Sequence, residues 1–274
     1  MNKLLVFTDL DGSLLDHETY SWDKAEPALR VLEKNNFPVV FTSSKTATEI
    51  INLKNEMQNH YPFISENGAV AAIPENYFYM SDKTQDIKFE KHLFGKSYKK
   101  INTVLNELHS EFNFRGFSDM GTDEVKDKTG LSYEQAENAQ QREASEPILW
   151  LDTSAAFDKF KVMLFANGLT STAGGRFIHI MSNVSKGKTV DWLIQKYREA
   201  EPQTEWYTVG IGDSFNDISM LEVVDCPIFI SNAKTRLPDL SGIKNLKRPQ
   251  LSGPAGWNQA IQSLLKKFHE EFKL

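Results

Sequence analysis

The stretch Leu4-Leu5-Val6-Phe7-Thr8-Asp9-Leu10-Asp11-Gly12-Ser13 joins a short apolar run to two closely spaced carboxylates. A short apolar run of this kind is typical of a strand that is buried on both faces of a parallel sheet. In open α/β sheets, ligands bind in the crevice beyond the carboxyl ends of such strands. The stretch therefore predicts an α/β fold with a ligand site that begins at Asp9.

Beyond this stretch, short apolar runs alternate with helical patterns at both ends of the chain. The first part predicts a helix that Ser21 caps, then strand, helix, strand and strand, at about residues 25–32, 38–41, 50–57, 63–64 and 68–73. The last part predicts helix, strand, short helix, strand and helix, at about residues 188–200, 207–211, 218–221, 228–230 and 257–268. This alternation is the signature of a parallel sheet with helices on its faces. We therefore predict a doubly wound parallel-sheet core of the α/β class, formed by residues 1–82 and 183–274.

The middle of the chain has a different order of elements. Helices are expected at about 101–108, 122–129, 132–142 and 154–166, and strands at about 112–117, 148–151, 169–172 and 177–181. Gly174-Gly175, between the last two strands, is a hairpin signal. Because this order is typical of antiparallel pairing, we predict an inserted α+β cap domain over residues 83–182.

The composition is that of an ordinary folded protein, and 274 residues suit one large or two modest domains. No segment approaches the roughly 18 uninterrupted apolar residues of a membrane helix. The net charge is −6, and no run of Lys or Arg marks a nucleic-acid footprint. The run from Leu4 to Phe7 is too short for a signal peptide, and Cys226 is the single cysteine. We expect a cytoplasmic protein without nucleic-acid or membrane partners; nothing in the pattern indicates an oligomeric state.

The two carboxylates of the opening stretch, Asp9 and Asp11, would repel each other in a shared crevice, so a compensating cation is expected. Their hard oxygen atoms suit Mg²⁺. An aspartate can also be a nucleophile that forms an acyl phosphate, while its neighbour protonates the leaving oxygen and then activates water. A plain Asp-Gly turn is the alternative. A calcium loop is excluded, because Leu14 and Tyr20 stand where it needs Gly and Glu.

A second acidic segment, Gly212-Asp213-Ser214-Phe215-Asn216-Asp217, also follows an apolar strand directly. Asp213 and Asp217 are four residues apart, so both can face one cavity if a helix begins between them. The alternative is a helix N-terminus whose acids complement the helix dipole. Two such segments at two strand ends favour a shared site over two unrelated turns.

Two further segments carry hydroxyl groups and lysines, one directly after the second predicted strand and one at the start of a later helix. Phe41-Thr42-Ser43-Ser44-Lys45 places them where backbone N–H groups can cradle a phosphate, although a plain helix cap has the same pattern. Ser185-Lys186-Gly187-Lys188 offers two lysines, either of which can stabilise charge on a phosphoryl group. Solvated lysines are the alternative there.

Together, and in this order, the four segments resemble the motifs of the haloacid dehalogenase superfamily of phosphatases. That pattern is Asp-x-Asp-Gly, then Thr or Ser after the second strand, then Lys, then Gly-Asp-x-x-Asn-Asp. Ser13 stands where the superfamily usually has Thr, but it keeps the hydroxyl group. The resemblance implies a Mg²⁺-dependent phosphoric monoester hydrolase in which Asp9 is the nucleophile and Asp11 the general acid and base.

The resemblance also implies roles for the remaining motif residues. Ser43 would bind the transferring phosphoryl group, and Lys186 would offset its charge; Lys186 is preferred to Lys188 because the superfamily's lysine precedes the glycine. The residues that would hold Mg²⁺, directly, through the Asp11 carbonyl or through ordered waters, are Asp9, Asp11, Asp213, Asn216 and Asp217.

The insertion resembles the large α+β cap of the superfamily's sugar-phosphatase branch, and within it the mannosyl-3-phosphoglycerate phosphatase family. The segments that carry this likeness are 41–46, 65–69, 116–120, 129–131, 142–147 and 174–179. A sugar phosphate is then the implied substrate. Arg176 is the candidate for holding a glycerate carboxylate or a phosphate, because a guanidinium binds either in a bidentate manner. The other substrate-binding candidates are Ser44, Lys45, Asn67, Asp119 and Arg142.

Three functions are compatible with these motifs. The leading hypothesis is hydrolysis of mannosyl-3-phosphoglycerate or a related sugar phosphate, with a cap that excludes bulk water. A sugar phosphomutase with the same core is the second. A phosphoaspartate signalling module is the third, although Asp11 and the long cap insertion favour turnover. His179 lies inside an apolar strand run, which favours a structural role.

Overall fold

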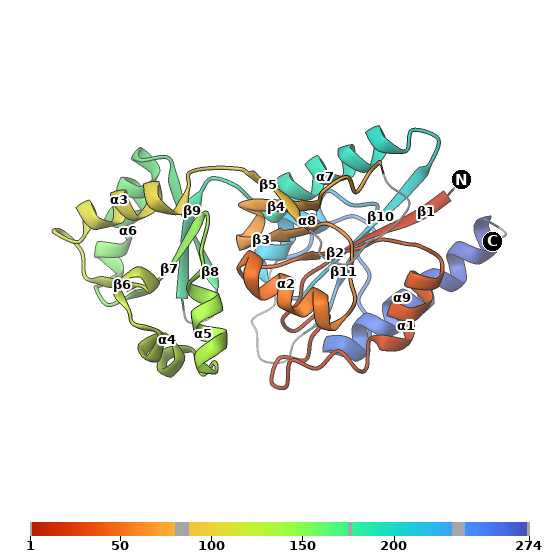
Figure 1. Cartoon of the computed structure of the whole chain (residues 1–274), viewed down its shortest axis with the longest axis horizontal. Coiled ribbons are helices and arrows are strands. Elements are labelled where there is room, and N and C mark those ends of the chain that lie inside the picture. The colour runs from red at the N-terminus through yellow and green to blue at the C-terminus, as the bar shows by residue number, and fades with distance from the viewer. Residues whose placement is uncertain (1, 80–87, 175–176, 232–238, 273–274) are drawn as a thin grey trace.

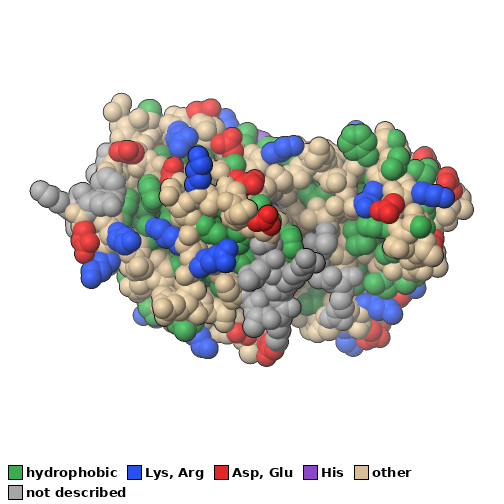
Figure 2. All heavy atoms as spheres, turned by 180° about the vertical axis from the view of Figure 1, so that it is seen from behind, with side chains coloured by type: hydrophobic (Ala, Val, Ile, Leu, Met, Phe, Trp, Pro, Cys, Tyr) green, Lys and Arg blue, Asp and Glu red, His purple; other side chains and the backbone are tan. Residues whose placement is uncertain are grey.

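The computed structural model describes residues 2–79, 88–174, 177–231 and 239–272. Figure 1 shows two lobes, a larger one built from the first and last parts of the chain and a smaller one built from its middle. Within the described ranges, no helix is long and apolar enough to cross a membrane. Figure 2 shows acidic and basic side chains interspersed over the visible face, without a large patch of one sign.

The larger lobe is organised around a seven-stranded sheet with the order β11-β10-β1-β2-β3-β4-β5. The five strands from β11 to β3 are parallel, whereas β4 and β5 are added antiparallel at one edge. Their bounds are Asn2–Thr8 (β1), Val39–Thr42 (β2), Phe63–Ser65 (β3), Val70–Pro74 (β4), Phe89–Leu93 (β5), Glu205–Gly212 (β10) and Cys226–Phe229 (β11). The predicted doubly wound, mainly parallel core is confirmed.

The central strand β1 is buried on both faces, as its unbroken apolar run predicts. Leu4 and Val6 enter one hydrophobic cluster, whereas Leu5 and Phe7 enter the other, because side chains alternate across a strand. The first cluster is shared with α1 (Glu26–Lys34), α2 (Ala47–Glu56) and α9 (Gly253–Phe272), and the second with α7 (Lys186–Ala200) and α8 (Ile218–Leu221). Helices therefore cover both faces of the sheet.

The register of β1 and β10 brings the two acidic segments together. Thr8 is paired with Ile211, so the two parallel strands end side by side. The backbone N–H of Asp9 extends this pairing by donating to the carbonyl of Ile211 at 2.8 Å. Residues that follow the two strands consequently leave the sheet at the same edge, where ligands of open α/β sheets bind.

The smaller lobe has a four-stranded antiparallel sheet with the order β6-β7-β9-β8. Its strands are Phe114–Gly116 (β6), Ser145–Trp150 (β7), Leu169–Gly174 (β8) and Phe177–Ser182 (β9). One hydrophobic cluster joins the sheet to α3 (Tyr98–Leu108) and α6 (Ser154–Ala166). Another joins it to η2 (Phe117–Asp119), α4 (Thr122–Thr129) and α5 (Tyr133–Gln140). This lobe is the α+β cap that the sequence predicts. The predicted hairpin signal is Gly174-Gly175, of which Gly175 lies outside the described residues.

Two local expectations differ from the structure. The helix expected after a Ser21 cap begins only at Glu26, because Ser21 instead accepts a hydrogen bond from the Asp23 N–H within a turn. Pro27 then occupies the first helical turn, where its missing N–H has no cost. Strand β5 was not expected, because four of its five residues are exposed and it carries Glu90 and Lys91, as is typical of an edge strand.

The two chain segments that link the lobes run side by side. The Lys96 N–H donates to the Ser182 hydroxyl at 2.8 Å, and a Cβ on Gly95 would lie 2.5 Å from the Ser182 Cβ. The predicted first boundary at residue 83 lies outside the described residues. Because β5 pairs with β4 in the core sheet, we propose that the cap begins after Leu93 and ends near Ser182.

A tight turn, η1 (Glu66–Gly68), packs against the start of α7. Its three residues all have positive φ, with Gly68 at +97°. A Cβ on Gly68 would lie 2.4 Å from the Ser185 carbonyl oxygen and 2.8 Å from the Lys186 nitrogen. Only glycine combines this backbone conformation with such a close approach.

Gly68→Ala should therefore destabilise the protein by about 2–4 kcal/mol, because it adds a backbone clash to left-handed strain. Gly130→Ala is the matched control, since Gly130 also has a positive φ of +82° but nothing lies within 4 Å of its added Cβ. That control should cost only about 1–2 kcal/mol. Urea unfolding of both variants measures the difference, and equal losses would contradict the clash.

Candidate active site

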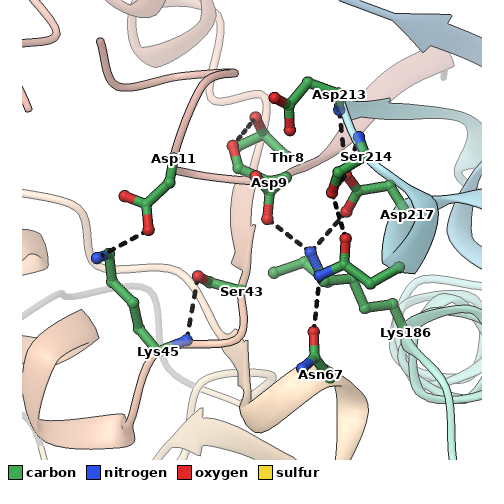
Figure 3. Close-up of polar contacts among 12 residues, drawn as sticks. Thr8, Asp9, Asp11, Ser43, Lys45, Asn67, Lys186, Asp213, Ser214 and Asp217 are labelled. Carbon is green, nitrogen blue, oxygen red and sulfur yellow. Dashed lines mark hydrogen bonds and ion pairs between the residues drawn. The ribbon is translucent and has the colours of Figure 1, made fainter. Parts of the chain in front are cut away.

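The site is organised around the ammonium group of Lys186, at the start of α7. The Lys186 Nζ donates to the Oδ1 of Asp9 and to the Oδ1 of Asp217, both at 2.6 Å (Figure 3). The Lys186 side chain and the Asp217 side chain are fully buried, and Asp9 is 6% exposed. A buried charge is costly unless it is paired, so this lysine and these two carboxylates require one another.

Burial and charge shift the protonation of the three groups. Burial alone would lower the pKa of Lys186, but the carboxylates of Asp217 and Asp9 outweigh it and raise that pKa above its usual range. Burial raises the pKa of Asp9 well above its ordinary value; Asp217 raises it further, and Lys186 only partly offsets this. The lysine is therefore positively charged in a site that holds an excess of carboxylates.

The loop after β10 places Asp217 and Asp213. The Asp217 Oδ2 accepts hydrogen bonds from the N–H groups of Asp213 and Ser214, both at 3.0 Å, as η3 (Phe215–Asp217) begins. This close turn needs glycine at position 212, because a Cβ there would lie 2.4 Å from the Asp217 Cβ. Asp217 thus binds the backbone of its loop through Oδ2 and Lys186 through Oδ1.

Asp9, Asp213 and Asp217 have the character of a metal site. Each is buried and offers a carboxylate oxygen, and these three atoms lie within 4.8 Å of one another. Lys186 forms ion pairs with two of the three, Asp9 and Asp217. Three hard carboxylate oxygens this close together suit a divalent cation such as Mg²⁺. The donor set therefore fits a metal ion beside Asp9.

Asp11 lies apart from this cluster, at the edge of the site. Its Oδ2 is 2.9 Å from the Nζ of Lys45, and Figure 3 shows the side chain directed toward that lysine. Burial would lower the pKa of Lys45, but the carboxylates of Asp11 and Glu49 raise it above its usual range. The Lys45 ammonium also lies 5.2 Å from the centre of the Tyr20 ring, a cation–π contact.

Ser43 and the η1 turn are hydrogen-bonded to each other and to the Asp213 segment. The Ser43 hydroxyl is buried and accepts from the Lys45 N–H at 3.2 Å, which leaves its own proton for a ligand. The Asn67 N–H donates to the Ser43 carbonyl at 3.0 Å, and the Asn67 Oδ1 accepts from the side chain of Asn216 at 2.8 Å. This turn consequently connects the Ser43 segment with the Asp213 segment.

A cavity of about 390 Å³ lies between the core and the cap and includes Asp9, Asp11 and Asp213 in its walls. Its cap side is largely apolar, with the rings of Phe117 and Phe177 in edge-to-face contact at 5.0 Å. The remaining residues that line it on the cap side are Thr129, Leu131, Ala139, Arg142, Pro147 and His179. A ligand in this cavity would contact both lobes.

The sequence matches the family model described as haloacid dehalogenase-like hydrolase over residues 6–241. The chain belongs to this family. The match covers both acidic segments, Ser43, Lys186 and the whole cap, so the family resemblance that the four motifs indicate is confirmed.

Relatives of this haloacid dehalogenase-like hydrolase cover nearly its full length. The glucosyl-3-phosphoglycerate/mannosyl-3-phosphoglycerate phosphatase of Methanococcoides burtonii is 37% identical over 271 residues, 97% of this chain and 98% of that protein. The protein of the same name from Persephonella marina is 35% identical over 266 residues, 96% of this chain and 97% of that protein. A crystal structure from Thermoplasma acidophilum is 18% identical, covers 97% of this chain and 99% of its own, and has a TM-score of 0.70, which shows the shared fold.

Arg142, one of the two arginines predicted to bind the substrate of this hydrolase, lines the cavity. Its Nη1 donates to the Ser44 carbonyl at 2.9 Å, across the gap between the lobes, and its Nε donates to the Ala139 carbonyl at 2.9 Å. No carboxylate in the described part of the chain forms an ion pair with Arg142. An anionic ligand can therefore take that place.

Of the other predicted substrate residues, Ser44 and Lys45 line this cavity, whereas Asn67 and Asp119 are not among the described residues that line it. The Asp119 Oδ2 accepts from the Gly116 N–H at 2.7 Å and lies 3.3 Å from the Nε2 of His109. Arg176 lies outside the described residues, so its role stays a prediction.

The sequence gives no signal for Glu66, and the structural role expected for His179 stays a prediction. Glu66 is fully buried in η1, although its segment reads as an ordinary polar turn. His179 lines the cavity from β9; burial, and then the charge of Arg142, lower its pKa to about 3, so the imidazole is neutral at neutral pH. The alternation on β9 could have found it, because His179 is two residues from Phe177 on the same face.

Lys186→Met should reduce turnover by about 10²–10³-fold, because it removes the cation between Asp9 and Asp217. It should also destabilise the fold by about 3–5 kcal/mol, since it leaves the buried carboxylates of Asp9 and Asp217 without the cation between them. Lys188→Met is the control, because Lys188 is exposed and contacts only a backbone carbonyl; its effect should stay within about 0.5 kcal/mol. Phosphate-release kinetics and urea unfolding measure both; similar behaviour of the two variants would contradict the central role of Lys186.

Proposed function

We propose that this chain is a Mg²⁺-dependent phosphomonoester hydrolase that acts through an aspartyl phosphate on Asp9 and uses mannosyl-3-phosphoglycerate or a closely related glycosyl phosphoglycerate as its substrate. The observation that carries the proposal is the position of Asp9. It lies at the end of the central strand, lines the cavity, and is held by Lys186 beside Asp213. A carboxylate so placed can attack phosphorus while nearby positive charge accepts the charge of the phosphoryl oxygens.

In the first step, a carboxylate oxygen of Asp9 attacks the phosphorus atom, and the bond from phosphorus to the substrate's ester oxygen breaks. The leaving oxygen takes a proton from the Asp11 carboxyl group, which lies at the cavity edge two residues from Asp9. We propose that the Ser43 hydroxyl and the Lys186 ammonium, which is hydrogen-bonded to Asp9, hold the phosphoryl oxygens. The products of this step are the glycosyl glycerate and the aspartyl phosphate.

In the second step, water attacks the phosphorus atom of the aspartyl phosphate. Asp11, now a carboxylate, accepts a proton from this water, and the Asp9–phosphorus bond breaks to release inorganic phosphate. Lys45 holds the Asp11 carboxylate at the cavity edge, close to where either leaving group or water would lie. The enzyme returns to its starting state, with the proton back on Asp11.

Asp9, Asp213 and the Asp11 carbonyl are the groups that we propose to hold Mg²⁺, with Asn216 and Asp217 acting on its waters. When bound, Mg²⁺ neutralises charge on the carboxylates and on the phosphoryl oxygens. Asp217 acts mainly by positioning, because Lys186 and backbone N–H groups already occupy both of its oxygens.

The choice of substrate is supported by the name of the two full-length relatives and by the chemistry of the cavity. A glycosyl phosphoglycerate carries a carboxylate near its phosphate, and Arg142 is a cation without an ion pair in the described structure. Its sugar needs apolar walls and neutral hydrogen-bonding groups, which Phe117, Phe177 and His179 offer.

A sugar phosphomutase and a phosphoaspartate signalling module remain the competing functions. A mutase would need a bisphosphate activator for turnover. A signalling module would keep its phosphoryl group for minutes. The cavity between core and cap favours hydrolysis of a small molecule over signalling, because a receiver of phosphoryl groups needs no enclosed ligand space.

The test is phosphate release from a panel of sugar phosphates headed by mannosyl-3-phosphoglycerate and glucosyl-3-phosphoglycerate, with Mg²⁺ and without a bisphosphate. We expect a strong preference for these two compounds, loss of activity with EDTA, and recovery with Mg²⁺ but poor recovery with Ca²⁺. Asp9→Asn, which keeps the side-chain shape, should show no turnover. Weak and even activity across the panel would contradict the substrate, and retained activity in Asp9→Asn would contradict the covalent mechanism.

Arg142→Gln should lower kcat/KM for mannosyl-3-phosphoglycerate by about 10–100-fold, mainly through KM, because a charge-assisted contact contributes about 1.5–3 kcal/mol. The loss should be smaller for a sugar phosphate without a carboxylate. Arg115→Gln is the control, since that cap arginine pairs with Glu124 at 2.7 Å, outside the cavity. This variant should leave kcat/KM unchanged for both substrates. Equal losses for both substrates would show that Arg142 does not read the carboxylate.

A further inference from the structure

Glu66 is a buried core carboxylate whose partners all come from the cap. It is fully buried, and its Oε1 accepts from the Glu143 N–H at 2.8 Å. Its Oε2 accepts from the Ala144 N–H at 3.1 Å and from the Ser145 hydroxyl at 2.6 Å. No lysine or arginine of the described chain forms an ion pair with it. The stability of this buried charge therefore depends on the cap being in place.

The same turn is hydrogen-bonded to both halves of the catalytic site. The Glu66 N–H donates to the Lys45 carbonyl, and the Asn67 N–H donates to the Ser43 carbonyl, both at 3.0 Å. The Asn67 side chain accepts from Asn216 at 2.8 Å. Three segments that are far apart in sequence, the Ser43 loop, the Asp213 loop and the segment 143–145 that leads into β7, consequently meet at two residues of η1.

The contact lies beside the linkers rather than at the mouth of the cavity. The Tyr98 N–H, at the end of the first linker, donates to the Glu143 carbonyl at 2.6 Å. Ala144 shares a hydrophobic cluster with Ala69 of the core and with Met181 and Val184 around the second linker. A contact at this place can persist while the far part of the cap moves, so it has the position of a pivot.

We propose that Glu66 is a positioning residue that fixes the pivot of the cap relative to the phosphoryl site, and so places Arg142 over the cavity. Arg142 directly precedes the three residues that Glu66 binds, and its guanidinium already reaches the Ser44 carbonyl. This inference rests on the proposed function, since it concerns how the glycosyl phosphoglycerate is bound.

Glu66 accordingly acts on the substrate through other residues. A displacement of the cap by about 1 Å can cost about 10²-fold in rate, even when the displaced contact is far from the chemistry. The phosphoryl chemistry itself would be affected less, because Asp9 and Lys186 both belong to the core. The expected signature is a change in discrimination between large and small substrates.

The experiment compares Glu66→Gln with the wild type through the ratio of kcat/KM for mannosyl-3-phosphoglycerate to kcat/KM for a small aryl phosphate. Glutamine has nearly the same shape but offers one acceptor oxygen to three donors. We expect this ratio to fall about tenfold, mainly through KM for the larger substrate. Ser145→Ala, which removes one of the three donors, should lower it partially and should add little in the Glu66→Gln background.

Glu146→Gln is the matched control. Glu146 is also a fully buried glutamate of the cap, but its Oε1 accepts from the Ser118 N–H and hydroxyl, within the cap. Glu146→Gln shows the structural effect of neutralising a buried glutamate. We expect the Tm of this variant to fall, while its ratio of kcat/KM for the two substrates stays at the wild-type value. If Glu66→Gln does not fold, Ser145→Ala carries the same test.

Two results would overturn the inference, and they are distinguishable. If the wild type prefers the glycosyl phosphoglycerate but the ratio is the same in Glu66→Gln, Ser145→Ala and Glu146→Gln, Glu66 is only structural. If the wild type itself shows no preference over the aryl phosphate, the proposed substrate fails, and the positioning role fails with it.

Discussion

The rest of the structure depends on one buried ammonium group between two buried carboxylates. Lys186 can occupy its place only if β1 and β10 are neighbours, because Asp9 and Asp217 follow those two strands. The start of α7 must also approach the sheet closely, which explains the positive φ of Gly68 and its contact with Ser185. Since none of the three charges is tolerable alone in a buried site, the cluster fixes how these distant segments fold together.

A second buried carboxylate, Glu66, joins segments that are distant in sequence at the boundary between the lobes. The cap is tied to the core near its linkers by hydrogen bonds to a buried carboxylate, and farther out by contacts such as that between Thr46 and the Asn138 carbonyl. Polar contacts of this kind are directional, so they specify the placement of the cap more sharply than apolar burial would. The core thus supplies the reacting groups, and the cap supplies the walls of the cavity.

Much of the fold was predictable because its signals are local. The run from Leu4 to Phe7 indicates a strand that is buried on both faces, and the helical pattern expected at about 132–142 corresponds to α5. Strand β5 escaped prediction because edge strands are selected for charge rather than for apolar alternation. The Ser21 cap failed because a competing turn, followed by Pro27, delays the helix to Glu26.

The sequence by itself determined which residues could do chemistry: two acidic segments, a hydroxyl segment and a lysine, each tied to the end of a strand or the start of a helix. Only the tertiary structure decided how their side chains are used. In the folded chain, Asp11 pairs with Lys45, and Asp217 binds Lys186 with one oxygen and the backbone with the other. Arg142 and His179 line the cavity, whereas Asp119 lies beside His109. The physical reason is that a strand end is fixed by local periodicity, whereas the partner of a buried charge is set by contacts between segments far apart in the chain.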